Sequence, residues 1–359
     1  MAEYRQLDTG KLRHFCEEIF NSHGFAPNES KIITDVLIRS DLYGIESHGV
    51  RLLVGYHNGI DAGRVNIKGK PEIVHETAVS AVIDAKKIIG QLAGVHGMEL
   101  AIEKARKSGC GMVSVRNSNH YGMAGYYSCM AAEADLLGIS MTNSMALSVP
   151  TFGRQAMIGS NPIALAMPAE PVNFSFDAAT TVVPKGKLDV YNKNGKSLPD
   201  QWVLDSEGKS SVNAAEVLHN ITHNLGGGIV PLGGASELYG GHKGYGLGLI
   251  VELFTAILSG GLTSNHVNTT SEFPGICHSF IAVDYGIFGD KKAIKAYMSA
   301  FLRELRESKK AEGQERIYTH GEKEAEMMAA RVNGQIPVNE ETVAEMKNIA
   351  EKQGVAWNF

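Results

Sequence analysis

The sequence predicts an α/β protein in which residues 76–289 form an α/β domain inserted into a helical domain made of residues 1–75 and 290–359. Helical hydrophobic periodicity occurs at both ends of the chain, and short strand-like runs alternate with helices in the middle. The chain also lacks the G-x-G-x-x-G fingerprint of an ordinary Rossmann domain, so we expect a non-Rossmann sheet. Its 359 residues suit two domains of about 150 residues or more each.

The N-terminal region has the spacing of amphipathic helices. Apolar residues recur every three or four positions in residues 8–24, where Asp8 or Thr9 would cap the helix. A second pattern covers residues 27–44, and a third helix is expected over about residues 50–59. We therefore expect an all-helical unit here, not the strand-first start of a βαβ fold.

The middle of the chain alternates between strands and helices. Strands are expected at residues 78–85, 111–118, 138–144, 162–169, 173–179 and 278–286, and helices at about 94–107, 126–137 and 243–258. The strands at 162–169 and 173–179 are close enough to form a hairpin. Amphipathic helices return at 293–308 and 341–354, and long loops are expected at 185–214 and 259–275. The second loop is a candidate substrate-side loop.

Composition excludes several classes of protein. The formal charge is 34 − 39 = −5, without a block of five like charges, which argues against a nucleic-acid partner. The N-terminus has no apolar signal core, and no run approaches the roughly 18 apolar residues of a membrane span, so a cytoplasmic protein is expected. The four cysteines are widely spaced and no zincin motif occurs. We expect reduced, mostly buried thiols and no metal site.

The first candidate site is GIESHGVR, residues 44–51. If Ser47 is an N-cap, His48 lies in the first turn of a helix and Arg51 lies on the same face. The helix dipole would keep the imidazole neutral and able to accept a proton, while Arg51 could bind a carboxylate. Tyr56 lies about two turns further along and would line the same face. The alternative is that His48 only caps or packs.

The second candidate site is RNSNHYG, residues 116–122, directly after an expected strand. Polar residues at the carboxyl end of a strand, followed by glycines and a helix, are typical of an α/β active-site rim. A solvated loop histidine at His120 is the alternative.

Three glycine-containing segments complete the set: residues 159–162, 176–181 and 241–246. The last opens a long helix and combines free backbone N–H groups with Lys243, which suits a phosphate or a carboxylate. Glycines at a helix start also serve close packing, so this interpretation remains open.

Taken in order, GIESHGVR, RNSNHYG, TNSMALSVPTFG, GSNPIALAMPA, FDAATT, GHKGYG and YTHGEKE resemble the type-2 malate/L-lactate dehydrogenase family, which also contains ureidoglycolate, sulfolactate and 2,3-diketogulonate reductases and a cyclic-imine reductase. The similarity runs from about residue 8 to residue 350. It implies a homodimeric oxidoreductase whose non-Rossmann α/β domain binds NAD or NADP, with NAD preferred, and whose substrate is a small 2-oxo or 2-hydroxy acid.

The resemblance also implies roles for individual residues. His48 corresponds to the proton donor and acceptor, and His120 to a second histidine that faces substrate in some members. Many relatives carry an arginine where Leu52 stands here, so Arg51 is offset by one residue, about 100° around a helix. The expected substrate contacts are Ser47, Arg51, Tyr56 and Lys243. The expected cofactor contacts are His120, Tyr121, Gly122, Asn143, Ser160, Asn161, Pro162, Ser175, Asp177, Ala178, Ala179, Thr180, His242, Lys243, Gly321 and Glu322.

The leading hypothesis is therefore an NAD(P)-dependent dehydrogenase of malate or lactate type. A cyclic-imine reductase is the nearest enzymatic alternative. A catalytically inactive protein that retains the fold and binds a nucleotide or small anion is the alternative from another class.

Overall fold

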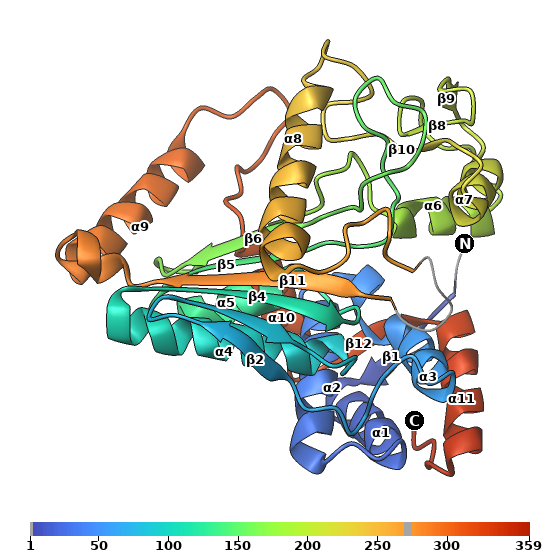
Figure 1. Ribbon diagram of the computed structural model, residues 1–359, viewed down its shortest axis with the longest axis horizontal. Helices are drawn as coiled ribbons and strands as arrows, with labels where there is room; N and C mark the ends of the chain where they lie inside the picture. The colour runs from blue at the N-terminus through green and yellow to red at the C-terminus, as the bar shows by residue number, and fades with distance from the viewer. Residues whose placement is uncertain (1–2, 269–273) are drawn as a thin grey trace.

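The central feature of the computed structural model, which describes residues 3–268 and 274–359, is a mixed seven-stranded sheet (Figure 1). Its strand order is β2-β3-β4-β11-β5-β6-β7. Among the described strands of this sheet, β3 and β4 pair in parallel and all other neighbours pair antiparallel. The strands are β2 (Glu72–Glu76), β3 (Ser80–Asp84), β4 (Cys110–Ser118), β5 (Leu137–Thr142), β6 (Ile163–Met167), β7 (Phe174–Ala178) and β11 (Ile276–Val283). The predicted α/β class and the β6–β7 hairpin are confirmed.

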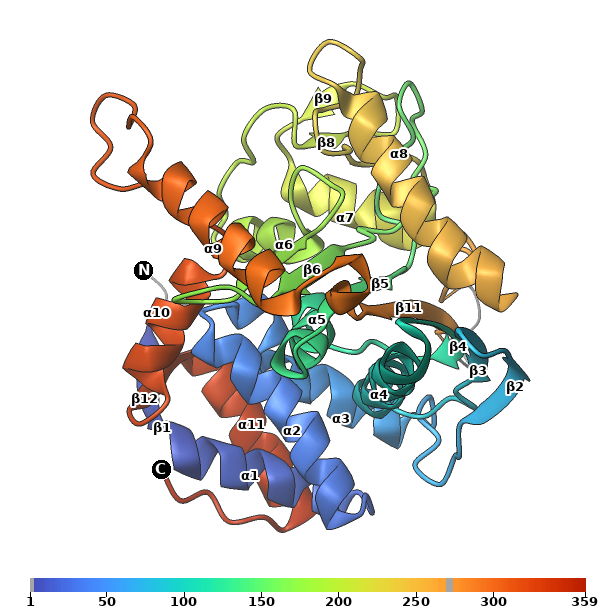
Figure 2. The same ribbon diagram turned by 90° about the vertical axis from the view of Figure 1, so that its left-hand side faces the viewer.

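Helices cover both faces of this sheet. On one face lie α4 (Gly90–Ser108) and α5 (Ala124–Glu133), seen nearly end-on in Figure 2. On the other face, α8 (Gly241–Glu252) continues into a π-helical segment (Leu253–Ile257) that contacts β4, β5 and β11. The packing of α4 on the sheet is close, because a Cβ atom at Gly97 would lie 2.5 Å from the Phe280 ring.

A second core joins the two ends of the chain below the α4–α5 layer. It is built from α1 (Thr9–Ser22), α2 (Pro27–Leu42), α3 (Leu53–Asp61), α10 (Glu322–Arg331) and α11 (Glu340–Gln353). Asp8 caps α1 by accepting a hydrogen bond from Lys11 N at 2.9 Å, as its sequence predicts. Phe15 packs edge-on against Trp357 and Phe359, with ring centroids 5.2 and 5.8 Å apart.

Two features of this helical region differ from the sequence expectation. The N-terminus is not all-helical, because β1 (Tyr4–Asp8) pairs antiparallel with β12 (Gln335–Asn339). The partner strand lies more than 300 residues away in sequence, so no local pattern could reveal it. In addition, α9 (Lys291–Glu307) lies on the far side of the sheet from α1, α2 and α11 (Figures 1 and 2). The division into two domains remains a proposal.

Residues 185–214 do not form the predicted long loop. They contribute α6 (Lys185–Lys193), β8 (Val203–Leu204) and β9 (Ser210–Ser211), which together with α7 (Ala214–His223) and β10 (Gly228–Ile229) form a small subdomain. Its core contains Leu188, Val203 and Val217, which are fully buried. The segment is mostly polar, and its few apolar residues form no periodic pattern, so sequence analysis predicted a loop here. Part of the other predicted loop, 259–275, lies outside the described residues.

Four cysteines have no disulfide partner, and Cys16, Cys129 and Cys277 are buried, as expected. Within the described ranges, the helices are all too short or too polar to cross a lipid bilayer.

We expect Phe15→Ala to lower the free energy of unfolding by about 3–5 kcal/mol, because this ring joins α1 to the C-terminal residues inside a packed core. Urea unfolding followed by circular dichroism measures the change. Phe288→Ala is the matched control, since its ring is 77% exposed and its loss should change stability by about 0.5 kcal/mol or less. Equal effects of the two substitutions would contradict the proposed role of this core.

Candidate active site

His48 lies in a break between helices and not at the start of an α-helix. It ends a short 3₁₀ segment (Glu46–His48), Gly49 is extended, and a second 3₁₀ segment (Val50–Leu52) leads into α3. The predicted helix over residues 50–59 therefore becomes fully α-helical only at Leu53. The dipole argument for His48 is wrong, because no α-helix begins at this residue.

The turn at His48 is held by a buried carboxyl group on α2. Asp41 accepts a hydrogen bond from Val50 N at 2.7 Å. A Cβ atom at Gly49 would lie 1.9 Å from Asp41 Oδ1, so the glycine of the SHG motif leaves room for this carboxyl group. Burial raises the pKa of Asp41 to about 7.

The fold brings the two predicted histidines together. His48 and His120 stack with ring centroids 5.7 Å apart and planes inclined by 22°. Tyr56 on α3 lies beside them, with its hydroxyl oxygen 2.8 Å from His120 Nδ1. Since His120 follows β4, the pair forms where the helical region meets the end of the sheet.

Both imidazoles are neutral near pH 7. Burial, with a smaller effect of Arg51, lowers the pKa of His48 to about 4. Burial and the neighbouring His48 lower the pKa of His120 to about 3. The predicted neutral imidazole is thus found, but burial is the main cause.

Hydrogen bonds distinguish the two rings. His120 Nδ1 accepts from Gly122 N at 3.3 Å, so the neutral ring carries its hydrogen on Nε2. His48 Nδ1 lies 2.9 Å from the Ser47 hydroxyl, which can either donate or accept. His48 can therefore exchange a proton at Nε2 while its other nitrogen remains hydrogen-bonded.

The two predicted cationic substrate ligands lie in different places. The guanidinium of Arg51 and the Cβ of Ser47 each lie 3.8 Å from the position that a Cβ atom would take at Gly186 of α6. Arg51 therefore lies on the His48 side, between the helical region and the small subdomain. Lys243 lies in the first turn of α8, whereas the far end of that helix contacts the sheet. The structure does not bring Lys243 to the histidine pair.

Several predicted cofactor residues meet along β7. Asp177 accepts a hydrogen bond from Gly125 N, at the start of α5, at 2.6 Å. Ser175 N donates to His320 O at 3.2 Å, which places Gly321 against the same strand. Just beyond the end of β7, Thr180 N donates to Ser160 O at 2.9 Å, so these two predicted residues are also close to the strand.

The side chains of three other predicted cofactor residues are interior. Tyr121 is 1% exposed, stacks on Tyr127 and His278, and lies 3.1 Å from the Ser140 hydroxyl. Asn143 is buried and binds the backbone of Leu262 at 2.8 Å and of Cys277 at 2.9 Å. Asn161 is buried and donates to Gly248 O at 3.1 Å and Glu252 Oε1 at 2.8 Å. These three side chains are used in contacts within the protein. A cofactor contact at these residues would therefore involve their backbone atoms.

Glu322 also has a structural role. Its carboxylate accepts from the Thr319 hydroxyl at 2.9 Å and from Arg316 at 2.8 Å, which holds the turn at Gly321. Burial raises the pKa of Glu322, but the hydrogen bond from Thr319 N–H, the two bonds above and the charge of Arg306 together hold this pKa below its usual value.

The start of α8 offers exposed donors for an anion. A Cβ atom would lie 1.9 Å from Gly234 O at Gly241 and 2.2 Å from Leu232 O at Gly244, so these two glycines serve close packing. His242 and Lys243 are nevertheless exposed, and Lys243 has no ion-pair partner in the described part of the chain. The donor set therefore fits a cofactor phosphate group.

Sequence analysis missed two residues beside the histidine pair. Gln91, in the first turn of α4, is fully buried next to the Tyr56 hydroxyl, and its side chain opposes the larger effect of burial on the pKa of that hydroxyl. His278 on β11 lies 2.8 Å from the hydroxyls of both Ser118 and Thr142. Neither residue belongs to a recognisable motif in its helix or strand. The sequence therefore did not indicate that either lies near the histidine pair.

Asp41→Asn tests the buried carboxyl group. The folded pKa of about 7 lies above the ordinary value of 3.8, so the charged form destabilises the fold and its cost grows as pH rises from about 4 to 7. Relative to the wild type, the variant should gain up to about 4 kcal/mol of unfolding free energy over that interval. Urea unfolding at pH 4, 5.5 and 7 measures this difference. Parallel pH curves for the two proteins would show that Asp41 does not titrate as described.

Comparisons with known proteins agree with this geometry. The family model for malate/L-lactate dehydrogenase matches residues 7–347. A malate dehydrogenase of Pyrococcus abyssi is 43% identical over 98% of this chain and 96% of that protein. An L-sulfolactate dehydrogenase of Methanocaldococcus jannaschii is 33% identical over 94% of each chain.

A solved structure has the same fold. The crystal structure of malate dehydrogenase from Entamoeba histolytica superposes with a TM-score of 0.96 at 33% identity, covering 99% of this chain and all of that one. The chain is thus an oxidoreductase and belongs to the malate/L-lactate dehydrogenase family.

Proposed function

We propose that the protein interconverts a small 2-hydroxy acid and its 2-oxo acid, using NAD or NADP. The observation that carries this proposal is the stacked pair of neutral histidines beside Arg51, at the junction of the helical region and the sheet. A 2-hydroxy acid needs a group that exchanges its hydroxyl proton and a cation for its carboxylate. His48 can supply the proton-exchanging group, and Arg51 beside it can supply the cation.

His48 is the proton-transfer residue in this proposal. The Ser47 hydroxyl can accept a hydrogen bond from His48 Nδ1–H, which leaves Nε2 free to gain or lose the substrate proton without a change in that bond. His120 has no such freedom, because Gly122 N–H donates to its Nδ1 and burial raises the pKa of the adjacent Tyr56 hydroxyl. His120 then donates its Nε2–H to the substrate oxygen, while Tyr56 holds the ring in place.

Substrate binding adjusts the basicity of His48. In the free protein the positive charge of Arg51 contributes to the low pKa of His48. A substrate carboxylate paired with Arg51 would offset this charge and favour the imidazolium. The histidine would thus become a better base for the hydroxyl proton once a substrate is bound.

The cofactor would be held by the α/β domain of residues 76–289 together with the turn at Gly321. Ser175 and Asp177 on β7 would line the cofactor site, and His242 and Lys243 would contact phosphate groups. When bound, the nicotinamide ring supplies or accepts the hydride at C2 of the substrate. This domain is non-Rossmann in our proposal, and NAD is the first cofactor to test.

A homodimer is part of the proposal. Apolar side chains are exposed at two places, including Leu253 and Ile257 in the π-helical segment after α8 and Tyr297 and Phe301 on α9. Exposed apolar groups of this kind commonly mark a protein interface. A second copy of the chain is the proposed partner, and a cytoplasmic location remains an expectation.

A spectrophotometric screen tests the proposed reaction. Oxaloacetate, pyruvate, 3-sulfopyruvate and ureido-substituted oxo acids are each supplied with NADH and NADPH, and we expect cofactor oxidation with at least one oxo acid. Turnover of a cyclic imine carboxylate alone would favour the cyclic-imine reductase. NADH binding, detected by fluorescence, without turnover of any compound would favour the inactive nucleotide-binding protein.

His48→Asn and His120→Asn separate the roles of the two rings. We expect His48→Asn to lower kcat by about 10²- to 10⁴-fold with little change in NADH affinity, because a positioned acid–base group is lost. His120→Asn should mainly raise KM for the oxo acid. Steady-state kinetics and NADH fluorescence measure both effects.

His219→Asn is the control for a general effect of histidine replacement, since His219 lies on α7 in the small subdomain. Loss of kcat in His120→Asn, together with a change of KM alone in His48→Asn, would exchange the two assignments. Near-normal kinetics in both variants would show that the histidine pair is structural.

A further inference from the structure

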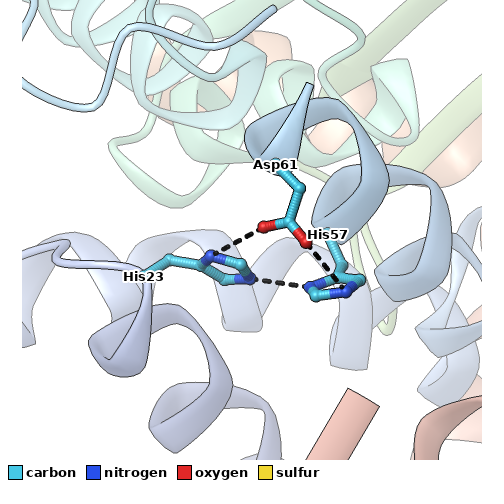
Figure 3. Close-up of side chains that lie close together, drawn as sticks. All are labelled: His23, His57 and Asp61. Atoms are coloured by element: carbon cyan, nitrogen blue, oxygen red, sulfur yellow. Dashed lines mark hydrogen bonds and ion pairs between the residues drawn. The ribbon is translucent and has the colours of Figure 1, made fainter. Parts of the chain in front are cut away.

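A second group of ionisable side chains lies in the helical region (Figure 3). His23 follows the last residue of α1, whereas His57 and Asp61 lie one turn apart on α3. His23 Nε2 is 2.9 Å from His57 Nδ1, and the two remaining ring nitrogens face Asp61. His57 Nε2 lies 3.3 Å from Asp61 Oδ2, and His23 Nδ1 lies 3.7 Å from Asp61 Oδ1.

The hydrogen bonds of this cluster do not satisfy His57 Nε2. His23 Nε2 and His57 Nδ1 share one hydrogen, and the 3.7 Å separation of His23 Nδ1 from Asp61 Oδ1 is too long for a hydrogen bond. When His57 donates from Nδ1 to His23, its Nε2 presents a lone pair to the Asp61 carboxylate. In the described residues this nitrogen is buried and has no hydrogen-bond partner. Such a buried nitrogen lacks a partner, and a metal ion between it and the carboxylate would supply one.

We propose that this cluster binds a divalent transition-metal ion of the Zn²⁺ class. His57 Nε2 and an oxygen of Asp61 are the direct ligands. His23 accepts the Nδ1 hydrogen of His57 and so fixes the tautomer that leaves Nε2 free for the metal. This inference does not depend on the proposed function.

The geometry suits such an ion. Ligand bonds of about 2.0–2.1 Å in a tetrahedral site separate the ligand atoms by about 3.3–3.4 Å, and the observed separation of His57 Nε2 and Asp61 Oδ2 is 3.3 Å. The i, i+4 spacing on a regular helix sets this separation without a change in the backbone. The Asp61 side chain is 52% exposed, which leaves a route for the ion and for water at the remaining positions.

Binding would fasten α3 to the end of α1. Tyr56 immediately precedes His57 on α3 and reaches His120 with its hydroxyl group, so the ion would lie on the helix that also lines the candidate active site. No local sequence pattern indicates this group, because His23 and His57 are separated by 34 residues.

Zn²⁺ titration of the full-length, chelator-treated protein tests the proposal. Binding is measured by competition with a fluorescent zinc indicator at pH 7.5, and Tm is followed in parallel. We expect one site in the wild type that raises Tm. His57→Gln and Asp61→Ala should each weaken this site at least tenfold and remove the Tm shift, and His23→Ala should weaken it about 10- to 100-fold.

The control is the double variant His219→Gln/His223→Gln, because these residues form an i, i+4 histidine pair on α7 that could bind Zn²⁺ independently. It should retain the Tm shift of the wild type. Asp61 is half exposed, so Asp61→Ala decides the result if the buried His57→Gln variant fails to fold. Wild-type Zn²⁺ affinity in Asp61→Ala, no binding in the wild type, or loss of the Tm shift in the double variant would each overturn the proposal.

Discussion

The hydrogen-bonded contact between the Tyr56 hydroxyl and His120 Nδ1 is the interaction on which the candidate site depends. Tyr56 belongs to the core shared by both ends of the chain, whereas His120 belongs to the turn that follows β4. That turn is held by Asn119, which donates to the backbone of Ile88 at 2.9 Å. The site therefore forms only when the helical region and the sheet pack against each other.

This location also explains the electrostatics of the site. Placing two histidines between packed layers removes water from both rings and lowers the pKa of each. His278, which is fully buried nearby, has its pKa lowered to about 3 by burial and by His120. The two rings are uncharged near pH 7 and Arg51 is the cation beside them, so the charge of a substrate carboxylate would have a large effect on proton transfer.

Local sequence patterns were sufficient to predict those elements whose stabilising contacts join residues close together in the sequence. The α1 helix was predictable from its apolar spacing and its Asp8 cap, and the β6–β7 hairpin from two adjacent strand-like runs. The β1–β12 pair was not predictable, because its two strands come from opposite ends of the chain. The 3₁₀ turn at His48 depends on the Asp41 carboxyl group, a contact that helix-cap rules do not include.

The same distinction applies to the site residues. Histidine and arginine could be proposed because their chemistry is visible in the sequence, but the amide of Gln91 becomes notable only through its burial beside Tyr56. Conversely, Asn143 and Asn161 looked like ligand contacts, although their side chains bind the protein itself. A polar residue in a motif can thus be required by the fold alone.

Some motif residues stabilise the fold and others lie in the candidate site, and this difference affects which residues are expected to determine the substrate. Gly49, Asn143 and Asn161 support the backbone of this chain through contacts within the protein. Arg51 is different, because its guanidinium lies 3.8 Å from the position that a Cβ atom would take at Gly186 on α6. The segment around α6 belongs to a small subdomain with its own core, so it can vary without disturbing the sheet or the histidine pair. A change of substrate is therefore expected to be easier to obtain by substitutions where Arg51 meets α6 than by substitutions at the histidine pair.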